Sequence, residues 1–106
     1  MTTVGEAIAR TRKVLGISQK ELARRIKKED GSPISPQYLN DIERDRRNPP
    51  SEFLIEQFAS ALGVPADHLF YLAGQIPPDL RDGSRPPEVV EEAFVAFRRA
   101  LRHGQR

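Results

Sequence analysis

The chain has 106 residues, with 17 lysines and arginines against 15 acidic residues and a net charge of +2. This length suits one small domain with a short appendage, and so small a net charge does not by itself indicate a nucleic-acid partner. The absence of cysteine excludes disulfides and thiolate metal sites and is typical of a reducing cytosol. Neither a membrane-spanning run nor a secretory signal pattern occurs. We therefore expect a cytoplasmic protein without membrane association.

Apolar residues recur at helical spacing along the chain, which predicts an all-α fold. The first two helices are marked by the capping boxes Thr3-x-x-Glu6 and Ser18-x-x-Glu21. Gly16 ends the first helix, so a tight bend joins the two. The residues expected to face the core are Val4, Ile8 and Leu15 in the first helix and Leu22, Ala23 and Ile26 in the second.

A polar segment with glycine and proline, residues 27–33, predicts a loop before the third helix. Ser35 and Pro36 fit the cap and the first position of this helix, which is expected to extend to about Arg44. Its apolar edge consists of Leu39 and Ile42. Because so narrow an edge does not hold a helix by burial alone, we expect one of its polar faces to meet a partner.

Two further helices follow, one over about residues 51–62 and one that begins after Pro65 and ends at Gly74. Their expected core residues are Leu54, Ile55, Phe58, Ala61, Leu62, Leu69, Phe70 and Leu72. The expected organisation is a five-helix domain at residues 1–74, a proline-rich linker at 75–87 and a C-terminal helix at 88–106.

Five short helices with a polar third helix after a turn are typical of a helix-turn-helix arrangement. The strings that carry a closer resemblance are Leu15-Gly16-Ile17-Ser18-Gln19-Lys20-Glu21-Leu22-Ala23, Ile34-Ser35, Tyr38-Leu39-Asn40-Asp41-Ile42-Glu43-Arg44, Arg47-Asn48-Pro49 and Ala59-Ser60-Ala61-Leu62-Gly63-Val64. Through them, residues 4–73 resemble the Xre/Cro-type helix-turn-helix repressors, and the resemblance implies a lambda-repressor-like DNA-binding domain. That family usually has a single glycine where this chain has residues 27–33, so the turn is about six residues longer than usual.

The distribution of charge agrees with DNA binding. Residues 10–28 contain eight basic side chains and one acidic side chain. Such a cluster neutralises phosphates and makes binding weaken steeply with salt, whereas its alternative interpretation is a solvated helix face. The residues expected to contact phosphates are Ser18, Gln19, Lys20, Lys27, Lys28, Arg44, Arg46 and Arg47.

The exposed side of the third helix is expected to enter the major groove of double-stranded DNA. Gln37 and Asn40 can each form paired hydrogen bonds with adenine, and Asp41 can accept a hydrogen bond from cytosine. Tyr38 can contact a thymine methyl group or a phosphate. For Asn40 and Asp41 the alternative is a role in helix solubility or in a local ion pair.

The resemblance also implies a structural ion pair, in which Arg12 of the first helix and Glu43 of the third are partly buried together. Neither a catalytic site nor a metal site is expected. His68 and His103 are the only histidines, and without cysteine they do not form a recognisable zinc set. Nucleotide-binding, metalloprotease and hydrolase motifs are also absent from the sequence, so no cofactor is expected.

The C-terminal helix carries Val90, Phe94, Phe97 and Leu101 at a coiled-coil-like spacing, and we call these four residues the seam. So short a seam needs a partner surface. Acidic residues at the start of the helix and basic residues at its end make two antiparallel copies complementary. We therefore expect a homodimer, with packing of the helix onto its own domain as the alternative.

The expected function is that of a sequence-specific, DNA-binding transcriptional regulator, a dimeric repressor that reads the major groove with residues 36–44. The alternative is a protein-interaction module of the same fold, such as an antitoxin or an adaptor. The polar face of the third helix and the basic clusters favour DNA over a protein partner.

Overall fold

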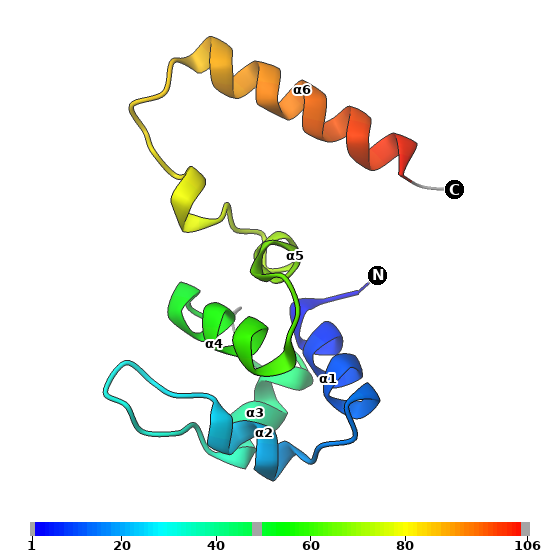
Figure 1. The fold of residues 1–106 in the computed structure, drawn as a ribbon, viewed down its shortest axis with the longest axis vertical. Coiled ribbons are helices and arrows are strands. Elements are labelled where there is room, and N and C mark those ends of the chain that lie inside the picture. The colour runs from blue at the N-terminus through cyan, green and yellow to red at the C-terminus, as the bar shows by residue number, and fades with distance from the viewer. Residues whose placement is uncertain (1, 48–49, 105–106) are drawn as a thin grey trace.

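The computed structural model describes residues 2–47 and 50–104 of the chain. Over these ranges the secondary structure is helical, which confirms the predicted all-α fold (Figure 1). The helices are α1 (Val4–Val14), α2 (Gln19–Arg25), α3 (Pro36–Glu43), α4 (Glu52–Leu62), α5 (Ala66–Leu72) and α6 (Pro87–His103), with a short 3₁₀ helix, η1 (Pro78–Leu80), between α5 and α6.

The first four helices each begin at a side-chain cap. The capping hydroxyl groups are those of Thr3, Ser18, Ser35 and Ser51. Each accepts a hydrogen bond of 3.0–3.3 Å from the backbone N–H three residues later. The carboxylate of Glu21, which a complete capping box would direct back to the cap, contacts Arg25 at 3.5 Å instead. Hydroxyl caps stabilise a helix by about 0.5–2 kcal/mol, which matters for helices as short as α2 and α3.

The helices α1 to α5 enclose one apolar core. Its largest fully buried side chains are Phe58, Phe70, Ile8, Leu22, Ile26, Leu39 and Ile55. These residues come from all five helices or from their ends, so each helix contributes its apolar edge to the same cluster. The core therefore fixes α2 and α3 against α1 and α4.

The prediction that Leu15 faces this core is wrong, because its side chain is 49% exposed. Leu15 lies just beyond the last residue of α1, where the chain turns at Gly16 with a φ of +72°. The turn rotates Leu15 away from the apolar stripe of the helix. Ile17, two residues further on, packs against the core instead.

The lengthened turn between α2 and α3 is more regular than the loop expected from the sequence. Residues 27–33 form a small hairpin, in which the Lys28 N–H donates to the Ser32 carbonyl at 2.8 Å and Gly31 adopts a φ of +88°. The hydroxyl and the N–H of Ser32 both donate to Asp30, and these bonds lower the pKa of the Asp30 carboxyl group. The inserted residues thus fold on themselves and leave the α2–α3 packing intact.

Helix α6 lies apart from the core, at the end of the molecule opposite to α2 and α3 (Figure 1). None of its described residues is buried. An ion pair of 2.8 Å between Arg81 and Glu52 ties the preceding linker to α4. Phe97 meets the Tyr71 ring of α5 edge to face, with ring centroids 6.1 Å apart. The seam of α6 therefore faces the domain through one aromatic pair and stays largely open.

Gly5 lies at a close approach of α1 to the end of α3. A Cβ atom at this position would clash with the carbonyl oxygen of Ile42 and would lie 2.7 Å from Asp45 Oδ1. We expect Gly5→Ala to destabilise the fold by about 1–3 kcal/mol in urea unfolding, although alanine is the better helix former. Gly83→Ala is the matched control, because Gly83 has open space around it. Equal stability of the two variants would contradict a tight α1–α3 contact.

Candidate nucleic-acid interface

One face of α3 is exposed at the end of the domain that also carries α2. Successive residues of an α-helix are rotated by about 100°, so Leu39, Ile42 and Glu43 share the buried side of α3. Gln37 and Arg44 fall on the opposite side and are exposed. The third helix thus presents a polar side, and Gln37 lies on it in the N-terminal half, where a helix entering the major groove contacts base edges.

Arg12 and Glu43 hold this helix against α1 through a buried ion pair. Arg12 Nε donates to Glu43 Oε2 at 2.8 Å and Arg12 Nη2 donates to Oε1 at 3.0 Å. The two side chains are only 11% and 5% exposed. The hydrogen bond with Glu43 raises the pKa of Arg12, against the opposite effect of burial. This is the ion pair that the family resemblance implies. Arg12 Nη1 also donates to the Ile17 carbonyl oxygen at 3.0 Å, and this bond fixes the turn between α1 and α2.

The ion pair extends to Gln19 and Asn40. Gln19 Nε2 donates to Glu43 Oε1 at 2.9 Å and to Asn40 Oδ1 at 3.2 Å. The first residue of α2 is therefore joined to the polar face of α3. These side chains line an open hollow between α1 and α3 together with Arg10. A predicted phosphate contact, Gln19, and a predicted base contact, Asn40, thus belong to one hydrogen-bonded network.

A second cluster lies around Asp41. Gln37 Nε2 donates to Asp41 Oδ1 at 3.1 Å, and Arg46 and Arg47 each lie 3.8 Å from its carboxylate oxygens. The Arg47 guanidinium also stacks over the Tyr38 ring, 4.3 Å from the ring centre. The structure therefore shows for Asp41 the local ion pair that was the alternative to base reading. The five residues form one group at the outer side of α3, in which Gln37, Arg46 and Arg47 are exposed and Tyr38 and Asp41 are half-buried.

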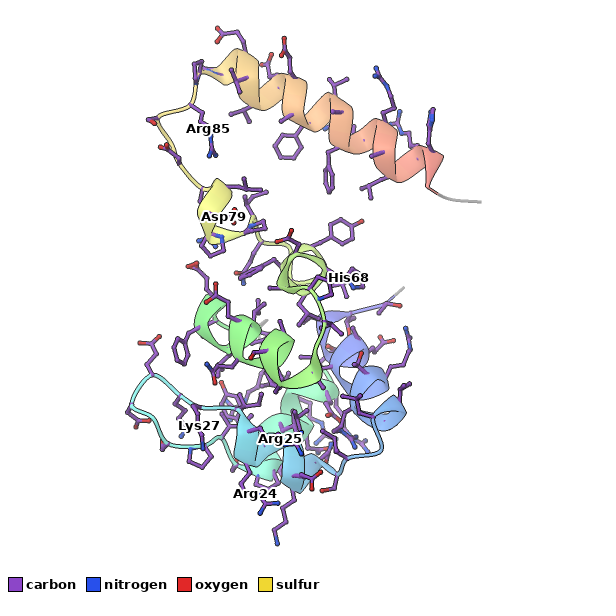
Figure 2. The ribbon with its side chains drawn as sticks, in the orientation of Figure 1. Arg24, Arg25, Lys27, His68, Asp79 and Arg85 are labelled. Atoms are coloured by element: carbon purple, nitrogen blue, oxygen red, sulfur yellow. The ribbon has the colours of Figure 1, made fainter. Side chains whose placement is uncertain are left out.

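The other predicted phosphate contacts surround this face. Ser18 caps α2, and Lys20, Lys27, Lys28 and Arg44 are exposed. Figure 2 shows Arg24, Arg25 and Lys27 together at the α2 end of the domain. The sequence does not mark Arg24 as an individual phosphate contact, because a basic residue within a charged run has no spacing signal of its own. Its exposure beside Lys27, which donates to the Arg24 carbonyl at 3.1 Å, adds it to the basic surface.

Two further findings concern metal binding and membrane crossing in the described residues. Within residues 2–47 and 50–104, no group of three or more histidine or acidic side chains is arranged to hold a metal ion. His68 is exposed on α5, remote from α3 (Figure 2). Among the helices of the described residues, none has the length and apolar character that crossing a membrane requires. Asn48 and Pro49, which the family resemblance includes, lie outside the described residues.

Comparison with known proteins agrees with this geometry. Residues 8–69 match the family model of the helix-turn-helix. The match covers more than half of the chain, and the protein belongs to the Xre/Cro-like helix-turn-helix family of DNA-binding regulators. A curated relative is the uncharacterized HTH-type transcriptional regulator y4dJ of Sinorhizobium fredii (strain NBRC 101917 / NGR234), 44% identical over 61 residues, which are 58% of this chain and 70% of the relative. No solved structure gives a significant match.

Proposed function

We propose that this protein is a sequence-specific transcriptional regulator that inserts α3 into the major groove of double-stranded DNA. The observation that carries the proposal is the polar face of α3, on which the exposed Gln37 and the half-buried Asn40 offer amide groups beside the basic residues of α2 and of residues 44–47. Amides read base edges, and the surrounding cations neutralise phosphates. The relative named as a transcriptional regulator supports the same function. Its place of action would be the cytoplasm, where bacterial DNA lies.

We further propose that the protein acts as a homodimeric repressor. Residues 1–74 would form the DNA-binding unit, 75–87 the linker and 88–106 the dimerisation element. The four seam residues are 40–45% exposed although all are apolar, and one aromatic pair with Tyr71 is too small a contact to bury them. The acidic start and basic end of α6 favour an antiparallel second copy as the occupant. A dimer on two half-sites would exclude other proteins from that DNA, which is how a repressor acts.

Selection of bound duplexes from a random pool tests the function. We expect one sequence to be enriched, and we expect Gln37→Ala and Asn40→Ala each to lose about 1–3 kcal/mol of discrimination at one base pair. Binding to random duplex, and its dependence on salt, should change little in either variant, because neither residue is charged. A protein that enriches no sequence and binds duplex without salt dependence would instead fit the protein-interaction module, an antitoxin or an adaptor.

A further inference from the structure

Gln37 and Asn40 of α3 both end in an amide group, and an amide group can point in either of two orientations. An amide presents a carbonyl oxygen that accepts and an NH₂ group that donates, and a 180° turn exchanges the two with almost no change of shape. A base edge distinguishes the two orientations, because adenine offers a donor at N6 and an acceptor at N7. An amide that reads bases must therefore be held in one orientation or lose part of its discrimination.

The orientation of Asn40 is set by a chain of contacts that starts at a carboxylate. The Glu43 carboxylate accepts two hydrogen bonds from Arg12, and a carboxylate has no donor to offer. Gln19 consequently turns its Nε2 group toward Glu43, at 2.9 Å. The same NH₂ group lies 3.2 Å from Asn40, so the atom of Asn40 that faces it is the oxygen Oδ1. The Nδ2 group and the second lone pair of Oδ1 remain for a base.

The orientation of Gln37 is set in the same way by a second carboxylate. The Asp41 carboxylate lies 3.8 Å from both Arg46 and Arg47, and its oxygens accept hydrogen bonds. Gln37 turns its Nε2 group toward Asp41 at 3.1 Å. Its oxygen Oε1 and its second N–H remain free for a base.

We propose that Gln19 and Asp41 are positioning residues for DNA specificity, which hold the amides of Asn40 and Gln37 in one orientation before DNA binds. The inference rests on the proposed function and deepens it. Asn40 and Gln37 contact the bases, whereas Gln19 and Asp41 act through them. This differs from the sequence-based expectations, in which Gln19 contacts a phosphate and Asp41 reads a base. Fixing a side chain in advance also lowers the entropy lost on binding.

The test compares base preferences of the full-length protein and its Gln19→Ala variant by selection from a random duplex pool. We expect Gln19→Ala to weaken the preference about threefold to tenfold at the base pair that Asn40→Ala also affects, and nowhere else. Affinity for random duplex should change less than about twofold. In the Asn40→Ala background, Gln19→Ala should have no further effect on preference, since the amide that it positions is gone.

Two variants of Asp41 distinguish a residue that positions Gln37 from a residue that itself contacts a base. Asp41→Asn can present either an oxygen or an NH₂ group to Gln37, so it should weaken the preference at the Gln37 base pair. Asp41→Glu keeps an accepting carboxylate one helical turn from Gln37 and should restore that preference. A changed preference at a different base pair would mean that Asp41 reads a base itself and would overturn its positioning role.

Thermal unfolding of each variant, with Glu56→Ala on the exposed side of α4 as control, ensures that folded proteins are compared. Equal loss of affinity for all sequences in Gln19→Ala would make Gln19 a phosphate contact and overturn the inference. The inference would also be overturned if the wild-type protein enriches a sequence and both Gln19→Ala and Asp41→Asn keep its base preference. If the wild-type protein enriches none, the proposed function fails, and the inference fails with it.

Discussion

Glu43→Ala is expected to destabilise the protein by about 3–5 kcal/mol, a large part of the stability of a domain of this size. The substitution leaves the Arg12 guanidinium, whose side chain is 11% exposed, without the carboxylate that it contacts at 2.8 and 3.0 Å. It also removes the oxygen that accepts from Gln19. An unpaired buried charge is far more unfavourable than an absent pair. Urea unfolding followed by circular dichroism measures the effect.

Three companion variants separate the ion pair from simple loss of packing. Arg12→Ala should be less stable than the wild type because it leaves Glu43 unpaired. The double variant Arg12→Met/Glu43→Leu should be more stable than Glu43→Ala, because neither charge then remains buried. Glu56→Ala removes an exposed carboxylate from α4 and should stay within about 0.5 kcal/mol of the wild type. A Glu43→Ala protein as stable as Glu56→Ala would show that the pair does not hold α3 in place.

Phe94→Glu is expected to convert the proposed dimer into a monomer and to weaken binding to a duplex with two half-sites by about 10²–10⁴-fold. Phe94 lies in the middle of the seam, is 40% exposed and packs edge to face against Phe97. A carboxylate there would have to lose its water in a paired seam. Sedimentation equilibrium gives the oligomeric state, and fluorescence anisotropy gives the affinity, with half-sites about 34–36 Å apart or a multiple of that distance.

Val95→Glu is the matched control, because Val95 is the next residue of α6 after Phe94 but lies about 100° around the helix from it. Its side chain is 53% exposed, and its substitution should leave both dimer and affinity unchanged. Binding of Phe94→Glu to a single half-site should also remain, since α1 to α5 carry their own core. A Phe94→Glu protein that stays dimeric would move the interface to another surface. A protein that unfolds would show that α6 supports the domain itself.

Local sequence was sufficient for the helices, because the signals that start a helix act within one turn. Ser18 and Ser35 cap the N–H groups three residues further on, as their patterns predict, and neither cap depends on the rest of the fold. The apolar spacing likewise predicted Ile8, Leu22 and Leu39 as core residues, and each is fully buried. The resemblance added the pairing of Arg12 with Glu43, which lie 31 positions apart and share no local pattern.

Only the tertiary structure decided how the polar residues of α3 are used. The sequence marks Gln19, Asn40 and Asp41 only as polar residues of two predicted helices, and this pattern is the same whether they contact DNA or other side chains. Gln19 and Asn40 come from different helices, so their contact exists only once the core has packed α2 against α3. The contacts of Asp41 with Arg46 and Arg47 depend on how the chain turns after α3. Leu15 is an apolar example of the same limit. The helical spacing of apolar residues includes Leu15, but α1 ends at Val14 and Leu15 is exposed. Helix formation depends on neighbours within a turn, whereas hydrogen bonding between side chains depends on the packing of the whole domain.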